Sequence, residues 1–166
     1  ENNIEAGAGD DVIVGGAGND YISASDGNDQ VDGGTGDDNI SGGAGNDKIS
    51  GGDGVDRISG NQGNDSIVAG AGNDIVDASD SADDGDDSVE GGAGNDSLMG
   101  GGGNDTLDGG EDWDRAQYYY TASSDWVVTR SLDGTVTMKR VGGTETDILK
   151  NMEEIGRSEE HTSELQ

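Results

Sequence analysis

The segment GGTGDDNIS at residues 33–41, followed directly by GGAGNDKIS at residues 42–50, decides the fold of this chain. Both segments have nine residues and share the pattern Gly-Gly-x-Gly-x-Asp-x-Ile-Ser. The same register continues over residues 6–77 and, after four residues (78–81) that we interpret as an insert, over residues 82–117. The chain therefore contains twelve nonapeptide repeats, a periodicity that is typical of stacked-repeat folds.

Three positions of the repeat agree closely among the twelve copies. Position six is Asp in all of them, position four is Gly in all but one (Asp112), and position eight is Ile, Val or Leu in all but one (Ala116). Positions seven to nine predict a short strand with one inward aliphatic side chain, because side chains alternate across a strand. Positions one to five predict a turn, where glycine allows positive φ and close approach of neighbouring backbones.

Two repeats, or 18 residues, make one coil with two strands. Stacked coils give two parallel sheets, with strands about 4.7–4.9 Å apart and sheet faces about 10 Å apart. The predicted fold is all-β. It is a parallel β-roll, meaning a two-sheet, right-handed solenoid with 18 residues per coil and a core of single-file aliphatic side chains, followed by a C-terminal β-rich cap.

Stacking brings the position-six aspartates of alternate repeats side by side along two edges. One edge carries Asp11, Asp29, Asp47, Asp65, Asp87 and Asp105, and the other carries Asp20, Asp38, Asp56, Asp74, Asp96 and Asp114. Carboxylates about 5 Å apart repel by roughly 3 kcal/mol per pair at an effective dielectric near 20. One buried aliphatic residue contributes only about 1.5–3 kcal/mol, whereas ordering nine residues costs on the order of 10 kcal/mol. The bare polypeptide is therefore not expected to fold, and a divalent cation between coils would reverse the electrostatic effect.

Calcium is the divalent cation that suits these groups best. It accepts about 6–8 oxygen ligands in irregular geometry, whereas magnesium requires a stricter octahedron and keeps its waters. Zinc prefers His or Cys, but the chain has no cysteine and its single histidine, His161, lies outside the repeats. We therefore predict several Ca²⁺ ions as the cofactor, whose binding free energy is also folding free energy.

The consensus Gly-Gly-x-Gly-x-Asp-x-(aliphatic)-x over residues 6–117 resembles the haemolysin-type calcium-binding repeats of RTX proteins. The resemblance implies a β-roll in which position-six carboxylates and carbonyl groups near positions two to four hold calcium in the turns. Carried over to this chain, the implied metal ligands are the carboxylates of Asp11, Asp20, Asp29, Asp38, Asp47, Asp56, Asp65, Asp74, Asp87, Asp96 and Asp105 and the carbonyl groups of Gly16, Gly18, Gly34, Gly36, Gly43, Gly45, Gly52, Gly54, Gly92 and Gly94.

The same resemblance implies a cellular context. Proteins of this family are exported by type I secretion and fold outside the cell, where calcium is abundant. We therefore expect residues 1–117 to form the calcium-binding β-roll of a secreted, extracellular protein, with the type I secretion machinery and an upstream domain of the same chain as its partners. Extracellular calcium modules bind with dissociation constants of about 10⁻⁴–10⁻³ M, which suits such a setting.

Four segments depart from the repeat consensus. Residues 24–26 (Ala-Ser-Asp) lack both leading glycines, and residues 60–62 (Gly-Asn-Gln) lack the second. The insert at 78–81 interrupts one turn, and residues 111–113 (Glu-Asp-Trp) replace glycine in the last repeat. We expect weaker or missing calcium sites near the insert and at Asp114.

The composition excludes several classes of function. With 37 acidic residues against 8 basic ones the net charge is −29, which repels nucleic acid and anionic membrane surfaces. No apolar run approaches the roughly 20 residues of a membrane-spanning helix, and a chain without cysteine forms no disulfide. The hydrophobic content of 28% also permits another interpretation, a disordered acidic linker. We favour the roll because aspartates that only solubilise a linker need no fixed register.

Residues 118–156 differ in composition and are predicted to form a C-terminal cap. The stretch Asp125–Lys139 is predicted to form a hairpin with an Asp-Gly turn, and residues 146–155 are predicted to form a last strand and turn. Repeat stacks need such caps to protect their open ends. The alternative is a small ligand-binding module that uses Tyr118, Tyr119 and Tyr120.

Both chain ends are unusual. Residues 1–5 fit positions five to nine of a preceding repeat, so we expect the chain to begin in mid-repeat. Residues 157–166 (RSEEHTSELQ) are the translation of a common short-read sequencing adapter, AGATCGGAAGAGCACACGTCTGAACTCCAG. We therefore expect these ten residues to be a non-native, disordered tail that stands in place of the true C-terminus and its export signal.

The predicted function is calcium binding by a secreted module that folds on export and stabilises or presents a neighbouring domain. An enzyme is not expected within this chain, because its only histidine is His161, so neither a zinc-protease motif nor a Ser-His pair can be assembled. Two alternatives remain open for the parent protein. One is a secreted RTX enzyme or toxin (protease, lipase, epimerase or haemolysin) whose active domain lies outside this chain, and the other is an adhesin that uses the roll as a stiff spacer.

Overall fold

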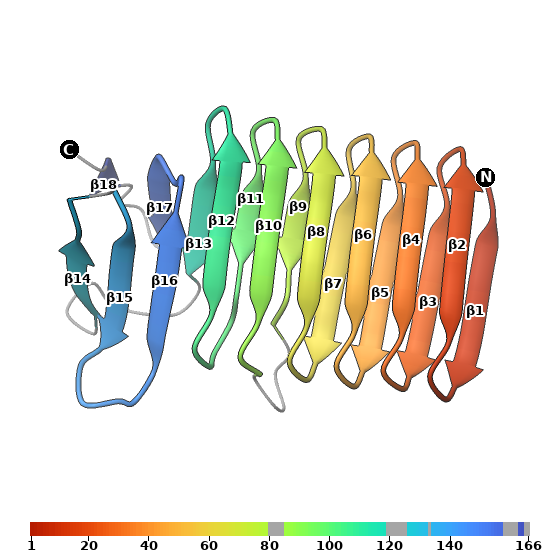
Figure 1. Ribbon diagram of the computed structural model, residues 1–166, viewed down its shortest axis with the longest axis horizontal. Coiled ribbons are helices and arrows are strands. Elements are labelled where there is room, and N and C mark those ends of the chain that lie inside the picture. Colours follow the sequence, from red (N-terminus) through yellow and green to blue (C-terminus); the bar gives the residue numbers. More distant parts are fainter. Residues whose placement is uncertain (80–84, 119–125, 133, 158–162, 165–166) are drawn as a thin grey trace.

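The chain folds into two sheets that face each other along a stack of coils (Figure 1). The computed structural model describes residues 1–79, 85–118, 126–132, 134–157 and 163–164. Within this part of the chain every regular element is a strand. It contains no helix long and apolar enough to cross a membrane.

Sheet A and sheet B have nine strands each. In spatial order, sheet A contains β1 (Asn3–Ala8), β3 (Tyr21–Asp26), β5 (Asn39–Ala44), β7 (Arg57–Gln62), β9 (Ile75–Asp77), β11 (Ser97–Met99), β13 (Arg115–Tyr118), β17 (Glu154–Arg157) and β18 (Ser163–Glu164). Sheet B contains β14 (Trp126–Arg130), β15 (Val136–Arg140), β16 (Thr146–Lys150), β12 (Thr106–Glu111), β10 (Ser88–Ala93), β8 (Ser66–Ala71), β6 (Lys48–Asp53), β4 (Gln30–Thr35) and β2 (Val12–Ala17). The predicted parallel β-roll is confirmed.

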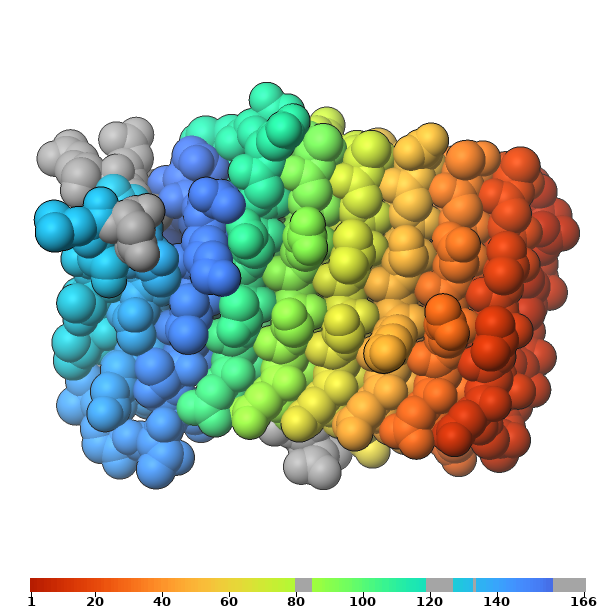
Figure 2. All heavy atoms as spheres, in the orientation of Figure 1, coloured from red at the N-terminus to blue at the C-terminus, as the bar shows by residue number. Residues whose placement is uncertain are grey.

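Successive coils pair in a strict 18-residue register. Ile22 lies opposite Ile40 in sheet A, and Val31 lies opposite Ile49 in sheet B, both in parallel pairs. The outer surface in Figure 2 shows the successive coils as parallel ridges. Most strands are six residues long rather than the predicted three. They extend through positions one to three of the next repeat because identical coils continue to pair there, as Gly16 does with Gly34.

The core is the predicted single file of position-eight side chains. Ile22, Ile40 and Ile58 from sheet A are at most 1% exposed, and Val31 and Ile49 from sheet B are at most 3% exposed. Position seven points outward, so that hydrophobic residues there, such as Val12, are exposed. Most repeats therefore bury one large aliphatic side chain, and alanine at position one adds to the core at Ala24, Ala69 and Ala78.

The insert does not begin at Ala78, as the sequence suggested. Ala78 is fully buried, and its N–H donates to the carbonyl oxygen of Met99 at 2.9 Å, so it occupies position one of a repeat. Gly85 lies against the carbonyl group of Gly63, which places it at position four. The insert therefore lies between Ala78 and Gly85 in the sequence. Asp80 and Ser81, which we assigned to the insert, lie outside the described residues.

Past the twelfth repeat the solenoid gains one more coil. β16 pairs in parallel with β12, and β17 pairs in parallel with β13. The predicted hairpin is confirmed as β14 and β15, which pair antiparallel and extend sheet B through β16. Its turn residue Asp133 lies outside the described residues. The boundaries of the cap at 118 and 156 stay a prediction.

The C-terminal tail is described only in part. Arg157 ends β17, and the two-residue strand β18 pairs antiparallel with β17, with Ser163 opposite Ile155. Residues 158–162 and 165–166, among them His161, lie outside the described residues. The non-native origin of the tail stays a prediction.

Candidate metal centre

The position-six aspartates form two ladders, one along each edge of the solenoid. We call them the Asp11 edge (Asp11, Asp29, Asp47, Asp65, Asp87 and Asp105) and the Asp20 edge (Asp20, Asp38, Asp56, Asp74, Asp96 and Asp114). The turns of the Asp20 edge connect each sheet-B strand to the next sheet-A strand and lie at the top of Figure 1. The turns of the Asp11 edge lie at the bottom. The two-ladder arrangement is the predicted one.

Within each ladder the carboxylates are held by backbone hydrogen bonds between coils. Oδ1 of Asp38 accepts the N–H of Asp20 at 2.7 Å, and Oδ1 of Asp56 accepts the N–H of Asp38 at 2.8 Å. The same bond recurs along the Asp11 edge, for example from the N–H of Asp29 to Oδ1 of Asp47 at 2.8 Å. From Asp29 and Asp38 onward, each ladder aspartate therefore uses one carboxylate oxygen to fix the spacing of two neighbouring turns.

The second carboxylate oxygen is left without a partner. Ten Oδ2 atoms are buried and have no hydrogen-bond partner in the described part of the chain. They belong to Asp20, Asp29, Asp38, Asp47, Asp56, Asp65, Asp74, Asp96, Asp105 and Asp114. Asp87 is also buried, at 4% exposure, whereas Asp11 in the first turn is half-buried. A buried, unpaired carboxylate oxygen is strongly destabilising, so these rows require a cation or a proton.

Burial raises the pKa of several carboxyl groups in the two ladders. The pKa of Asp56 and that of Asp74 rise to about 6, chiefly by desolvation, with a further contribution from neighbouring aspartates. Desolvation likewise raises the pKa of Asp65 to about 7 and that of Asp105 to about 8. In each case the N–H donor of the preceding coil opposes the rise. The charged form is thus costly unless a metal ion compensates for it.

Carbonyl oxygens of the turns complete each ladder. At position four, a Cβ on Gly36 would lie only 2.6 Å from the carbonyl oxygen of Gly18 in the neighbouring coil, and its φ is +121°. Glycine is therefore required there both by the backbone conformation and by the stacked carbonyl. All ten predicted carbonyl donors, Gly16, Gly18, Gly34, Gly36, Gly43, Gly45, Gly52, Gly54, Gly92 and Gly94, occupy positions two and four with positive φ.

Equivalent carbonyl positions occur in turns that the prediction left out. Positive φ at positions two and four is also found at Gly7, Gly9, Gly27, Gly63, Gly70, Gly72, Gly101, Gly103 and Gly110 and at the non-glycine residues Ser25, Asn61 and Asp112. Ser25 keeps its carbonyl stacked against Gly43 in spite of its side chain. The repeat register alone could have identified all of these positions.

Two further acidic residues join the ladders, and the prediction missed both. Asp147 is buried, and its Oδ1 accepts the N–H of Asp105 at 3.2 Å. Glu153 accepts the N–H of Asp114 through Oε2 at 2.8 Å. For Asp147 the signal was present, because GGTETDILK at residues 142–150 matches the repeat except at position four.

These donors suit calcium. They are hard oxygen ligands, carboxylate and carbonyl, from flexible turns. Within the described residues no group of three or more His, Cys, Asp or Glu side chains is close enough to hold a metal ion by itself. The predicted ligand set, which combines ladder carboxylates with turn carbonyls, stays a prediction.

Comparison with known families agrees with this geometry. The family of the RTX calcium-binding nonapeptide repeat (4 copies) matches residues 1–31, 23–58, 32–67, 50–83 and 81–115. The chain belongs to this family. Calcium binding by the RTX roll is thereby confirmed, and the repeat module is not itself catalytic.

Two further comparisons concern individual proteins, first curated sequences and then solved structures. No curated protein matches it. Among solved structures it is similar to "Crystal structure of extracellular lipase LipA from Serratia marcescens", with 20% sequence identity and a TM-score of 0.39. The match covers 87% of this chain but only 36% of the lipase chain.

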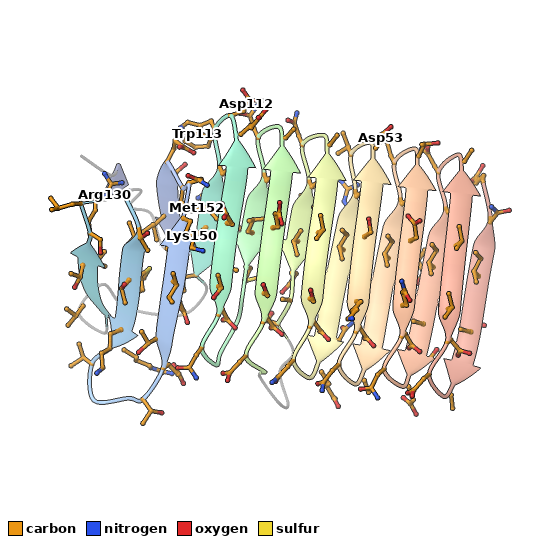
Figure 3. The ribbon with its side chains drawn as sticks, in the orientation of Figure 1. Asp53, Asp112, Trp113, Arg130, Lys150 and Met152 are labelled. Carbon is orange, nitrogen blue, oxygen red and sulfur yellow. The ribbon has the colours of Figure 1, made fainter. Side chains whose placement is uncertain are left out.

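In the described part of the cap of the RTX chain, a hollow of about 450 Å³ is lined by Arg130, Gly134, Thr135, Lys150, Asn151, Met152 and Glu153. Arg130, Lys150 and Met152 are labelled in Figure 3. Tyr118 is not among its lining residues and is buried. Tyr119 and Tyr120 lie outside the described residues. The alternative of a tyrosine-based ligand module therefore finds no support from Tyr118.

Proposed function

We propose that this chain is the calcium-dependent roll of a secreted protein, folding on export and stabilising or presenting an upstream domain of the same parent chain. The observation that carries the proposal is the row of ten buried, unpaired carboxylate oxygens. These oxygen atoms recur twice per coil, once in each ladder. A requirement for cations in both ladders explains this regular spacing.

The proposed ligands are the ladder aspartates from Asp11 to Asp105 and the carbonyl groups at positions two and four. Calcium bound there supplies positive charge between carboxylates that otherwise repel. Backbone hydrogen bonds fix the spacing of the turns, because Oδ1 of a ladder aspartate accepts an N–H of the neighbouring coil. The predicted loss of calcium near the insert and at Asp114 stays part of this proposal.

Folding outside the cell follows from the same balance. Where calcium is scarce, the carboxylates repel and the single aliphatic side chain per repeat does not compensate for chain entropy. Where calcium is abundant, binding free energy becomes folding free energy. An unfolded chain during export and a folded module afterwards are the expected states. Membership of the RTX family supports this order of events.

A calcium titration of the full chain tests the proposal. In chelator at neutral pH we expect far-ultraviolet circular dichroism of a disordered chain, and added calcium should produce a cooperative β-sheet signal. Magnesium serves as the matched control, since it disfavours irregular carbonyl-rich sites. A magnesium response as large as the calcium response, or a β-sheet signal already complete in chelator at neutral pH, would contradict the proposal.

A further inference from the structure

The last carboxylate of the Asp11 edge differs from all those before it. Asp147 continues the ladder, because β16 pairs with β12 in the usual parallel register. Its Oδ1 accepts the N–H of Asp105, as expected of a position-six residue. Its Oδ2, however, accepts a hydrogen bond from the hydroxyl group of Tyr118 at 3.1 Å. Both oxygens of this buried carboxylate are therefore satisfied by protein groups.

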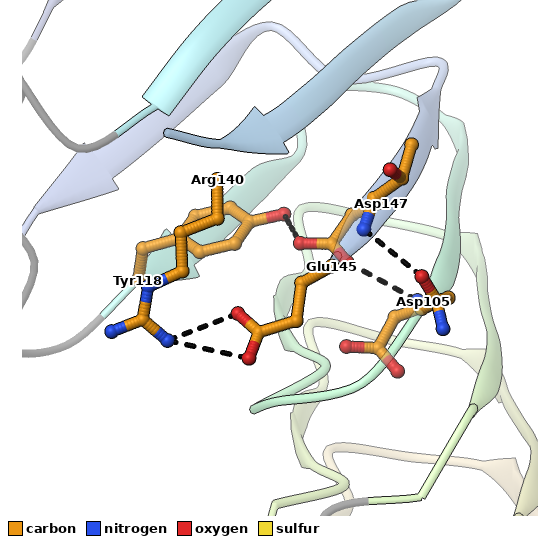
Figure 4. A network of polar contacts seen from close by, with 7 residues as sticks. Asp105, Tyr118, Arg140, Glu145 and Asp147 are labelled. Atoms are coloured by element: carbon orange, nitrogen blue, oxygen red, sulfur yellow. Dashed lines mark hydrogen bonds and ion pairs between the residues drawn. The ribbon is translucent and has the colours of Figure 1, made fainter. Parts of the chain in front are cut away.

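Tyr118 reaches this position from the opposite sheet. It is the last residue of β13 in sheet A, it is 6% exposed, and its hydroxyl points to Asp147 between the sheets (Figure 4). Ten other ladder aspartates leave their Oδ2 unpaired. The phenol thus takes, at the end of this ladder, the place that a cation takes in the turns before it.

The loop before Asp147 also lacks the stacked carbonyl groups of the other turns. A Cβ on Gly142 would meet nothing within 4 Å, although its φ is positive, and a Cβ on Gly143 would meet only Arg140. In regular turns a Cβ at position two, the position of Gly143, meets a carbonyl oxygen of the previous coil, as Gly34 meets that of Gly16. Glu145, the other acid of this loop, is paired with Arg140 at 3.0 Å. The last coil therefore contributes neither a free carboxylate oxygen from Asp147 nor stacked carbonyl groups from the loop before it.

The opposite edge ends in a similar way. Asn151 lies against Gly109 at position one, and Glu153 bonds the N–H of Asp114 at position six. The turn from position one to position six thus has only three residues here, 151–153. The other turns of the Asp20 edge have six, for example 109–114. The carbonyl groups of positions two and four have no counterpart in so short a turn.

We propose that the calcium array ends one coil before the solenoid does. The coil of β16 and β17 docks without calcium, and the Tyr118 hydroxyl replaces the ion at Asp147. This inference rests on the proposed function, because it specifies where the calcium ladder stops. It assigns Tyr118 as a positioning residue that acts through Asp147.

Calcium stoichiometry of the full chain provides the first test. Asp147→Asn should bind as many calcium ions as the unmodified chain at saturation, whereas Asp65→Asn, in the middle of the same ladder, should bind at least one fewer. Equilibrium dialysis or native mass spectrometry gives the count. A loss in Asp147→Asn equal to that in Asp65→Asn overturns the inference while leaving calcium binding intact. A lack of calcium binding by the unmodified chain refutes the proposed function itself.

Amide hydrogen exchange at saturating calcium provides the second test. Tyr118→Phe leaves Oδ2 of Asp147 buried and unpaired, so exchange of the Ile148 amide, which bonds the Asp105 carbonyl at 2.8 Å, should accelerate roughly tenfold. The Thr106 amide, one coil further in, is the internal reference. Tyr21→Phe is the matched control, since Tyr21 is exposed on β3. If the exchange rate of the Ile148 amide is unchanged in Tyr118→Phe, the assigned role of Tyr118 is overturned. This holds whatever number of calcium ions Asp147→Asn binds.

Discussion

The two edges of the roll are built from the same repeat but differ in regularity. Along the Asp20 edge, five successive turns have glycine at positions two and four, and only the last turn departs, at Asp112 and Trp113 (Figure 3). Along the Asp11 edge fall Ser25, Asn61 and the insert. The three internal departures share one edge because they lie in odd-numbered repeats and each coil contains two repeats.

This difference shows how the solenoid tolerates irregularity. Ser25 and Asn61 adopt φ of 84° and 71°, so each keeps the glycine-like turn at the cost of backbone strain. The insert leaves position four in register, since Gly85 stacks on Gly63 and Gly103 stacks on Gly85. The three internal departures from the consensus therefore all lie on the Asp11 edge, and the strands of both sheets remain paired. We expect the Asp20 edge to hold the more uniform calcium sites.

Removing calcium at different pH values should have the largest effect. Aspartate has a pKa of about 3.9 when unfolded, and the folded values are raised. Stability from this source is therefore present at low pH and is lost as pH rises through the folded pKa. The loss should occur near pH 6 at Asp56 and Asp74, but nearer pH 7 at Asp65 and pH 8 at Asp105.

In chelator, the chain should thus retain more β-sheet at pH 5 than at pH 8. Circular dichroism follows the overall change, and carboxyl carbon chemical shifts in NMR spectra resolve the two edges. With saturating calcium the pH dependence should be much weaker over this range. Equal β-sheet content at pH 5 and pH 8 in chelator would show that burial does not control these carboxyl groups.

Removing a ladder carboxylate in mid-stack should have the next largest effect. Asp56→Ala deletes a proposed calcium ligand together with the acceptor of the Asp38 N–H. We expect a loss of about 3–5 kcal/mol in calcium-loaded stability, as for breaking a buried ion pair. Asp47→Ala, on the other edge, should cost a similar or smaller amount. Asp114→Ala, beside the short last turn, should cost clearly less. Denaturant unfolding at fixed calcium measures all three, and equal losses would count against the stacked-ladder mechanism.

A methyl group added at position four should distinguish a stacked turn from an open one. Gly36→Ala places a Cβ 2.6 Å from the Gly18 carbonyl oxygen in addition to straining a positive φ. Gly9→Ala strains a similar φ of +114° but meets nothing within 4 Å. We expect about 2–4 kcal/mol of destabilisation for the first and about 1 kcal/mol for the second. Similar thermal midpoints for both variants would mean that the carbonyl ladder imposes no close contact.

Replacing Ser25 or Asn61 of the Asp11 edge with glycine should have the smallest effect, and it should stabilise the protein. Ser25→Gly relieves the positive φ without a known side-chain bond to lose, so we expect about 1 kcal/mol of stabilisation and a lower calcium midpoint. Asn61→Gly should gain less, because Nδ2 of Asn61 donates to Oγ of Ser41 at 3.0 Å. A calcium titration followed by tryptophan fluorescence or circular dichroism compares the two. A higher midpoint for Ser25→Gly would contradict the view that this turn is strained.

Most of the roll could be predicted from its repeat. The position-eight core, the 18-residue register and the two aspartate ladders follow from spacing alone, because each coil contacts only its neighbours. The start of the insert at Ala78 was wrong, since Ala78 satisfies position one as well as a glycine does. Strand length was also wrong, because positions one to three were interpreted as part of a turn although they pair with their equivalents in adjacent coils.

The amino-acid sequence by itself determined the roll, its two ladders and their need for calcium, because those properties repeat every nine residues and depend on local spacing. The tertiary structure alone decided how the roll ends. Asp147 and Asp105 are 42 residues apart, and the residues between them include the β14–β15 hairpin and Tyr118. Periodicity cannot predict which hydroxyl group meets the last carboxylate, because that contact depends on how two segments distant in sequence pack between the sheets.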